Sequence, residues 1–300
     1  MDRIRCVVAA TDFSSLSEQV VQRAARIASQ HQAELHVVHV VRPLDLYPGL
    51  TLAPEESSHH DTTLQQAEHT RLDEQASALA KQFDVRIHTA TRLGRAHTEI
   101  VAYAQKVGAD LLVAGARGES TLKDLFLGST VSRLMSVATC PVLIVKTPAD
   151  APYRQVLAAV DFSPVSSAVI EHAISLADGA QVDTLHVLGS EVEQRLRKAR
   201  FVNLDITDWL ARMRTEAEKQ LRTLLGHIDN GASVRLMVQP GVPPEAICQQ
   251  GRESQADLVV LGRHGHGGGS LQDWLLGSVS KGVAQTATCD VLLISPTASA

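Results

Sequence analysis

The chain has 300 residues, of which 44% are hydrophobic and 20% are charged, and its formal net charge at pH 7 is −5. This composition is typical of a folded globular protein and excludes a disordered or collagen-like chain. The acidic balance and an aromatic content of 3% argue against a nucleic-acid partner, which would need a broad positive surface and stacking platforms. At this length we expect two domains.

The sequence also argues against a membrane partner. The longest apolar runs, such as residues 111–116, are about a third of the ~18 residues that a spanning helix needs. The N-terminal residues enter a strand pattern at once, without the apolar core of a secretory leader. Cys6, Cys140, Cys248 and Cys289 are too few for a disulfide framework, and we expect the first, second and fourth to be buried small side chains. A reduced, cytoplasmic setting is therefore expected.

The sequence repeats itself once along its length. The segment VAATDFS, which begins at Val8, recurs as LAAVDFS from Leu157, and ADLLVAG recurs as ADLVVLG. Matching segments lie 147 to 149 residues apart, which is too long for a solenoid unit and fits a duplicated domain. A short proline-bounded linker separates the halves, so we predict one domain over residues 1–147 and another over 152–300.

Each half alternates short β-rich runs with helical stretches. Several runs are almost continuously apolar, as strands buried on both faces of a sheet must be. This alternation favours right-handed crossovers and a parallel, doubly wound α/β sheet. We predict five strands per half in the order 3-2-1-4-5, with helices on both faces. The predicted strands are Ile4–Ala10, Glu34–Val41, Val85–Thr91, Asp110–Ala116 and Val142–Lys146, then Gln155–Val160, Val182–Leu188, Ser233–Gln239, Asp257–Gly262 and Val291–Ser295.

Helix signals lie between these runs. The pattern Ser15-x-x-Glu18 is typical of a capping box at a helix start. Ser163-Pro164 predicts an N-cap followed by a proline in the first turn. The stretches Ser58–Phe83 and Ser190–His227 would be the helical crossovers after the second strand of each half.

A ligand cleft is expected where the strand order reverses. In open parallel sheets, ligands bind beyond the carboxyl ends of the strands at this point. For the order 3-2-1-4-5 the point lies between the first and fourth strands. Thr11 and Asp12 follow the first strand. Ala114 and Gly115 lie near the end of the fourth strand, and Gly118 follows it. The two glycines let main-chain N–H groups approach an anion without obstruction.

A second glycine pair completes an anion-binding pattern. Gly128 and Ser129 open the next helix, whose N-terminus favours a phosphate. Asp12 can accept hydrogen bonds from a ribose or an adenine edge, and the backbone of Val40 can pair with a base. The full spacing Gly-x2-Gly-x9-Gly-[Ser/Thr] should arise by chance in roughly one chain of this length in a hundred. The alternative is that these are turn and helix-entry glycines without a ligand.

These motifs resemble the universal stress protein family in its tandem two-domain form, over about residues 4–147 and 154–296. The resemblance rests on Asp12 after the first strand, on His39-Val40 at the end of the second, on the glycine spacing and on the closing strand CPVLIV. It implies a flavodoxin-like or Rossmann-like fold of the HUP type. In that family the glycine pattern marks the members that bind ATP.

The resemblance also implies roles for single residues in the first half. Asp12 would hold the adenosine end, and the backbone of Val40 would hold the adenine. Gly115 and Gly118 would line the ribose and phosphates, and the start of the next helix, at Gly128, Ser129 and the amide of Thr130, would hold the phosphates. The cofactor would be ATP, with or without Mg²⁺. The predicted nucleotide-binding residues of this half are Thr11, Asp12, Val40, Ala114, Gly115, Gly118, Gly128, Ser129 and Thr130.

The second half departs from the family spacing. Eleven residues, instead of nine, separate Gly265 from Gly277. The extra length falls in the glycine-rich run 266–270, which can either bulge outward with the site intact or shift the phosphate loop. We still predict a second nucleotide site in this half. Its residues are Asp161, Val187, Leu261, Gly262, Gly265, Gly277, Ser278 and Val279.

The sequence favours a binding protein over an enzyme. It contains neither a P-loop lysine pattern nor a Gly-x-Ser-x-Gly elbow. Arg117, Lys123 and Arg263 could help neutralise phosphates. However, no sequence pattern indicates a residue that would position an attacking water, as efficient phosphoryl transfer requires. We expect no catalytic residues and at most slow ATP hydrolysis. Two alternatives stay open: a slow ATPase or nucleotide-transferring enzyme, and an interaction scaffold whose glycine loops are structural.

By the same resemblance, the protein would act in survival under stress, through nucleotide-dependent signalling or partner binding. The family pairs its domains through their last strands, so Val142–Val145 and Val291–Ile294 would pair within one chain. We also expect that the chain can associate further into a homodimer. The sequence specifies neither the stress nor the partner.

The thirteen histidines do not by themselves predict a metal site. His59-His60 and His264-x-His266 are pairs with no cysteine nearby, whereas zinc usually takes three or four converging ligands. Solvated loop histidines, or a phosphate contact by His264, explain them better, and we predict no metal.

Overall fold

The computed structural model describes residues 4–44, 54–118, 127–189, 206–226, 228, 233–265 and 276–295. The chain divides into two compact units, Met1–Asp150 and Ala151–Ala300. Each unit is a parallel sheet with helices, which confirms the α/β class and the tandem arrangement predicted from the repeat.

The first unit contains a five-stranded sheet whose neighbouring strands are all parallel. The pairs β3–β2, β2–β1, β1–β4 and β4–β5 give the order 3-2-1-4-5. The two central strands are almost wholly buried, as their apolar sequences require. The strands are β1 (Cys6–Thr11), β2 (Glu34–Val41), β3 (Ile87–Leu93), β4 (Leu111–Gly115) and β5 (Val142–Val145).

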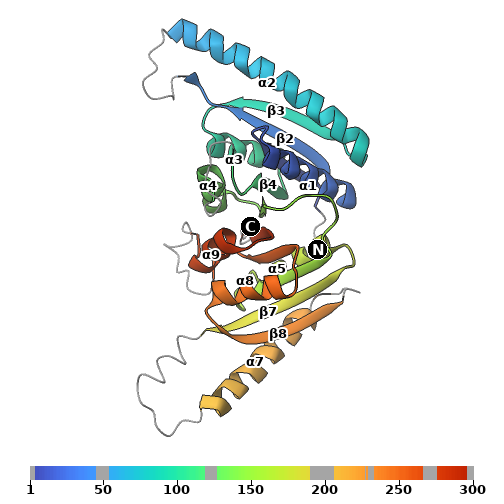
Figure 1. The fold of residues 1–300 in the computed structure, drawn as a ribbon, viewed down its shortest axis with the longest axis vertical. Coiled ribbons are helices and arrows are strands. Elements are labelled where there is room, and N and C mark those ends of the chain that lie inside the picture. Colours follow the sequence, from blue (N-terminus) through green and yellow to red (C-terminus); the bar gives the residue numbers. More distant parts are fainter. Residues whose placement is uncertain are drawn as a thin grey trace. The chain divides into compact units, whose positions relative to one another are not determined.

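The helices of the first unit pack in two pairs. The first pair is α1 (Ser15–His31) and α2 (Pro54–Phe83), and the second is α3 (Ala96–Val107) and α4 (Ser129–Val137). Helix α2 packs against β3 and β2, and Figure 1 shows it running alongside these strands. Its Asp73 accepts a hydrogen bond from Thr89 of β3. Tyr103 of α3 bonds His36 of β2, and because neighbouring strand residues alternate between faces, α2 and α3 cover opposite faces of the sheet.

The second unit repeats this plan. The pairs β8–β7, β7–β6, β6–β9 and β9–β10 are parallel and give the corresponding order. The core again lies along the central strands, where Val156, Leu157, Val259 and Val260 are inaccessible to solvent. The elements are β6 (Gln155–Val160), α5 (Ser166–Ala177), β7 (Gln181–Gly189), α7 (Ile206–Gly226), β8 (Val234–Gly241), α8 (Pro243–Glu253), β9 (Leu258–Gly262), α9 (Ser278–Thr286) and β10 (Asp290–Ile294).

Two predicted helix starts differ from the structure. The N-cap of α1 is Ser14, whose side chain accepts a hydrogen bond from the Ser17 amide, so the predicted capping box is one residue late. Helix α5 begins at Ser166, because the residues before it form a turn in which the Ser163 carbonyl accepts from the Ser166 amide at 2.9 Å. Pro164 therefore belongs to this turn, outside the helix.

Other predictions shift by smaller amounts or fall on undescribed residues. Of the predicted crossover Ser190–His227, α7 accounts for Ile206–Gly226, and residues 190–205 lie outside the described ranges. Cys289 is buried as expected, but Cys6, the first residue of β1, and Cys140, two residues before β5, are partly exposed. Within the described ranges, no helix combines the length and the hydropathy needed to cross a bilayer.

Candidate functional site

A cleft of about 280 Å³ opens at the carboxyl ends of the first unit's strands. It lies between the ends of β1 and β4, where the strand order reverses, and the N-termini of α3 and α4 also border it. All nine residues predicted for the first-half site line it. The lining residues are Ala10, Thr11, Asp12, Ser17, Val40, Ala96, Ile100, Ala114, Gly115, Arg117, Gly118, Gly128, Ser129, Thr130, Val131 and Leu134.

A tight turn after β1 fixes the carboxylate of Asp12. Its Oδ1 accepts hydrogen bonds from the Ser14 amide at 3.1 Å and from the Ser14 hydroxyl at 2.6 Å. Phe13 between them adopts φ 60°, in the left-handed region, and its amide donates to Thr11 Oγ1 at 3.2 Å. A non-glycine residue in this region costs about 1–3 kcal/mol. The turn therefore presents Asp12 in one orientation at the expense of backbone strain.

His39 supports this turn from the neighbouring strand. Its Nδ1 donates to the Thr11 carbonyl at 2.9 Å, and its ring lies 4.5 Å from the Phe13 ring, centroid to centroid. The hydrogen bond fixes the tautomer of the imidazole. The His39 side chain thus holds the Asp12 turn, while the next residue, Val40, lines the cleft.

Gly115, the last residue of β4, and Gly118, which follows the strand, have packing reasons for lacking a side chain. A Cβ on Gly118 would stand 2.7 Å from Asp12 Oδ2. A Cβ on Gly115 would stand 3.0 Å from the Arg117 carbonyl oxygen and 3.3 Å from Val20 Cγ2. Gly118 therefore allows the main chain after β4 to reach the Asp12 carboxylate across the cleft.

Gly128 has no such packing reason. It is the N-cap of α4, with φ −61° and ψ 153°, which any residue can adopt. A Cβ there would meet its nearest neighbours at 3.5 Å or more, an ordinary van der Waals distance. No side chain caps this helix, whereas Ser14 caps α1. The first amides of α4 therefore face the cleft with the positive end of the helix dipole.

An apolar wall stands opposite the glycines. Val40 of β2 and Ala96 and Ile100 of α3 form it. Neither α3 residue was predicted from the sequence, because only tertiary packing brings the start of α3 over the cleft. One available signal was the repeat itself, since apolar pairs spaced i, i+4 follow Gly94 and Gly241 in the two halves.

The charged side chains predicted to meet phosphates differ in their positions. Arg117 lines the first cleft. Lys123 lies outside the described residues. Arg263 is only 4% exposed and does not line the second cleft, so the prediction that it helps neutralise phosphate there is wrong.

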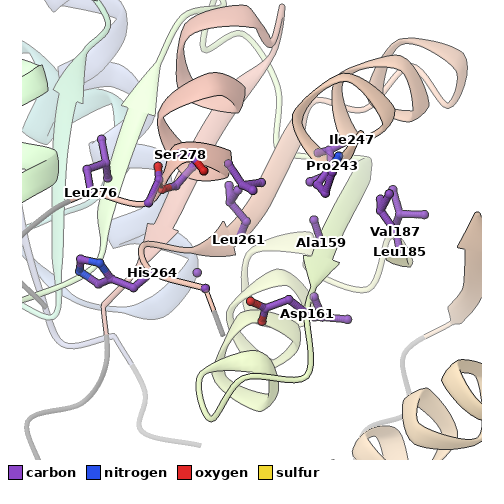
Figure 2. A pocket seen from close by; sticks show the side chains of 16 residues that line it. Ala159, Asp161, Leu185, Val187, Pro243, Ile247, Leu261, His264, Leu276 and Ser278 are labelled. Atoms are coloured by element: carbon purple, nitrogen blue, oxygen red, sulfur yellow. Dashed lines mark hydrogen bonds between the residues drawn. The ribbon is translucent and has the colours of Figure 1, made fainter. Parts of the chain in front are cut away.

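The second unit carries a corresponding cleft of about 480 Å³. All eight residues predicted for the second site line it. Figure 2 shows Asp161, Leu261 and Ser278 around the cleft, with Pro243 and Ile247 of α8 in the positions of Ala96 and Ile100. The lining residues are Ala159, Val160, Asp161, Leu185, Val187, Pro243, Ile247, Leu261, Gly262, His264, Gly265, Leu276, Gly277, Ser278, Val279 and Ser280.

The turn chemistry of the first half recurs in the second. Asp161 Oδ1 accepts from the Ser163 amide at 3.0 Å, and Phe162 adopts φ 62°. His186 Nδ1 donates to the Val160 carbonyl at 2.9 Å. Burial lowers the pKa of His186, although the bond to Val160 and the charge of Asp161 act in the opposite direction. The imidazole is therefore neutral at pH 7.

The helix N-terminus is where the two clefts differ most. A Cβ on Gly277 would stand 3.0 Å from the Arg263 carbonyl and 3.2 Å from Ser280 Oγ. The Ser280 hydroxyl occupies this space, 2.7 Å from the Arg263 carbonyl. Packing alone therefore explains the glycine at 277. His264 and Val279 also replace the Arg117 and Thr130 of the first cleft.

The geometry of the first cleft suits a ligand with two chemically different ends. Uncapped amides at α4 suit an anionic group, a fixed carboxylate suits hydroxyl or amine donors, and the wall of Val40, Ala96 and Ile100 suits a flat apolar ring. The side chains that line this cleft do not by themselves indicate a particular cofactor or metal ion.

Comparisons with known proteins agree with this architecture. A model of the universal stress protein family matches residues 3–146 and again 152–295. The chain therefore belongs to the universal stress protein family, in a form with two tandem domains.

Individual relatives support the tandem form. A universal stress protein of Mycolicibacterium smegmatis is 28% identical over 309 residues, covering 97% of each chain. A universal stress protein of Methanocaldococcus jannaschii is 34% identical over 142 residues, covering 47% of this chain and 82% of its own. The crystal structure of a universal stress protein from Archaeoglobus fulgidus shares the fold, with a TM-score of 0.67 at 20% identity, over 97% of this chain and 98% of its own.

Proposed function

We propose that the first-half cleft binds an adenine nucleotide, ATP with or without Mg²⁺, and that the second-half cleft is a related, weaker site. The observation that carries the proposal is Gly128, a glycine that neither backbone conformation nor packing requires at the uncapped start of α4. A triphosphate there would accept hydrogen bonds from the amides of Ser129 and Thr130 and would be stabilised by the helix dipole. The Gly128 amide already donates to the Ala116 carbonyl at 2.8 Å, so this glycine leaves room for the phosphate.

The rest of the cleft suits the other end of the nucleotide. Asp12, held by Ser14, would accept hydrogen bonds from the ribose hydroxyls. The wall that includes Val40 and Ile100 would take the adenine ring, and the backbone of Val40 would pair with its edge. The second site has a larger cleft but a glycine at 277 that packing explains, so we propose lower nucleotide affinity there.

We further propose that the bound nucleotide acts as a signal in a stress response, by changing how the protein associates with partners. The family membership supports a stress role. Catalysis is at most slow, the protein works in the cytoplasm, and neither nucleic acid nor a membrane is its partner. Pairing of Val142–Val145 with Val291–Ile294 within one chain, and a homodimer, stay predictions that light scattering and crosslinking would test.

A thermal-unfolding titration of the full chain with ATP tests the binding proposal. ATP at about 100 times its Kd should stabilise the protein by about 2.7 kcal/mol, and GTP should do less. Absence of any shift would favour the scaffold alternative. Turnover measured on the same protein separates the enzyme alternative, because sustained hydrolysis above about one per second lies in the usual range of enzymes.

A further inference from the structure

A second group of chemically reactive side chains lies at the opposite end of the first unit's sheet. Glu34 and His36 stand at the start of β2, and His88 stands at the start of β3. One donor atom from each of the three lies within 4.8 Å of the other two. Across the described ranges, these residues are the one group of three or more histidine, cysteine or acidic side chains that meets this spacing.

Strand periodicity and register bring the three together. Side chains at alternate strand positions point to the same face, so Glu34 and His36 share a face of β2. His36 pairs directly with His88 across the two strands. The His36 and His88 rings are stacked, with centroids 4.7 Å apart and planes 22° from parallel. His88 Nε2 lies 3.7 Å from Glu34 Oε2.

Two neighbouring side chains orient the donors. The Tyr103 hydroxyl bonds His36 Nδ1 at 3.0 Å, which leaves Nε2 to act as a ligand. Arg86 donates to Glu34 Oε1 at 2.8 Å, while Glu34 Oε2 faces His88. Histidines and carboxylates that bind metals are commonly held in this way by a second layer of hydrogen bonds.

The spacing of the donor atoms defines the ligand set. Cys6 pairs with Glu34 in the register of β1 and β2, but its sulfur is not among the donor atoms that lie within 4.8 Å of one another. The donor set is therefore two imidazoles and one carboxylate.

The second half of the chain provides an internal comparison. Asp183 pairs with Arg235 at the equivalent register position. Arg235 Nε donates to Asp183 Oδ1 at 3.0 Å, and Asp183 is completely buried. There, opposite charges satisfy each other. Two imidazoles cannot do the same, because they repel when both are protonated and gain little when both are neutral. A cation bound between them would hold both rings through their nitrogen lone pairs.

We propose that Glu34, His36 and His88 bind a zinc ion. Two imidazole nitrogens and one carboxylate oxygen form a known zinc donor set, with a fourth position left to water. Ligand atoms around tetrahedral zinc lie about 3.3 Å apart, closer than the 4.8 Å limit of the group. The side chains of Glu34 and His88 are 46% and 45% exposed, so they can rotate to close this gap. Magnesium, which prefers oxygen ligands, should not compete.

Calorimetric titration of zinc chloride into the metal-free full chain tests this site. The decisive variant is His36→Asp with His88→Arg, because it installs the pair that the same fold carries at Asp183 and Arg235. The wild type should bind one zinc per chain at micromolar Kd, and the double variant should bind it at least tenfold more weakly. His69→Gln is the matched control, since His69 is exposed and bonds Thr91 from α2, on the other face of the sheet.

Two further variants keep the proposal falsifiable if the double variant does not fold. Glu34→Gln removes one ligand charge and should weaken zinc binding at least tenfold. Tyr103→Phe removes only the positioning hydroxyl, and it should weaken binding about tenfold and alter the visible spectrum of the cobalt-substituted protein. Absence of zinc binding in the wild type, or equal zinc affinity in the wild type, in Glu34→Gln and in Tyr103→Phe, would overturn the proposal whether or not the double variant folds.

Discussion

In the first cleft, Gly118 lies so close to Asp12 that a Cβ on the glycine would stand 2.7 Å from the Oδ2 atom of the carboxylate. The corresponding distance from Gly265 to Asp161 Oδ2 is 3.0 Å. In both halves, therefore, the turn after the fourth strand passes close to the carboxylate after the first strand. A side chain at Gly118 must displace this carboxylate, and one at Gly265 would press against it.

The first prediction concerns Gly118→Val. The new side chain would displace the Asp12 carboxylate and fill the approach to the amides of α4, so ATP binding to the first half should be lost. Isothermal titration with ATP measures this. Gly226→Ala is the control, because a Cβ there meets no atom within 4 Å, and it should bind ATP as the wild type does. Wild-type affinity in Gly118→Val would show that the nucleotide lies elsewhere.

The second prediction concerns Gly128→Val. The protein should stay folded, because a Cβ at 128 has ordinary contacts and a changed N-cap costs about 1 kcal/mol. ATP binding to the first half should nevertheless be abolished, since the side chain occupies the place of the phosphate. Urea unfolding and ATP titration of the same preparation separate the two effects. If the variant kept normal ATP affinity, Gly128 would be only a helix-entry residue.

The third prediction separates the two clefts. Asp12→Ala removes a charge-assisted hydrogen bond and should weaken the first-half site by about 1.5–3 kcal/mol, or about 10- to 150-fold. Asp161→Ala should leave that site unchanged and affect only the weaker one. Titrations that resolve two affinities check both statements. Identical changes in the two variants would contradict the assignment of a tighter site to the first half.

The fourth prediction concerns pH. Burial lowers the pKa of His186 below its ordinary value of 6.5, so the folded protein binds this proton less tightly than the unfolded chain does. The stability that depends on neutral His186 is then complete above about pH 6.5 and declines as the pH falls below it. The decline is at most about 1.4 kcal/mol per pH unit for each such group, and His36 acts in the same direction.

Urea unfolding at pH 7.5 and pH 5.5 measures this loss. His186→Asn keeps a donor for the Val160 carbonyl but cannot be protonated, so it should lose less stability on acidification than the wild type. An equal loss in both proteins would exclude His186 as a source of the pH dependence.

Much of the fold was predictable because the same strand–helix pattern occurs in both halves of the sequence. The repeated strand–helix alternation predicted ten strands, and each lies within a few residues of its observed position. The helix starts were less predictable. Ser163 has the sequence of an N-cap, but its amide bonds to Asp161 in the tight turn around Phe162, and the helix begins only at Ser166. Such turns depend on tertiary contacts that no local pattern contains.

The candidate site was predictable along the strand ends and less so elsewhere. Thr11, Asp12 and the glycines follow from the strand order and from local chain chemistry, and the cleft includes them. Ile100 and Ile247 were missed because they depend on how the third helix of each unit packs over the cleft. The group around His36 was missed for a related reason, since only the register of β2 and β3 places it beside His88.

The most direct test of the nucleotide proposal is to release and identify the molecule that freshly purified protein carries. The full chain is denatured, and the supernatant is analysed by mass spectrometry with the amount expressed per chain. We expect an adenine nucleotide at close to one per chain in the wild type and little in Gly118→Val. Absence of any nucleotide from the wild type, together with no binding of added ATP at millimolar concentration, would contradict the proposed function.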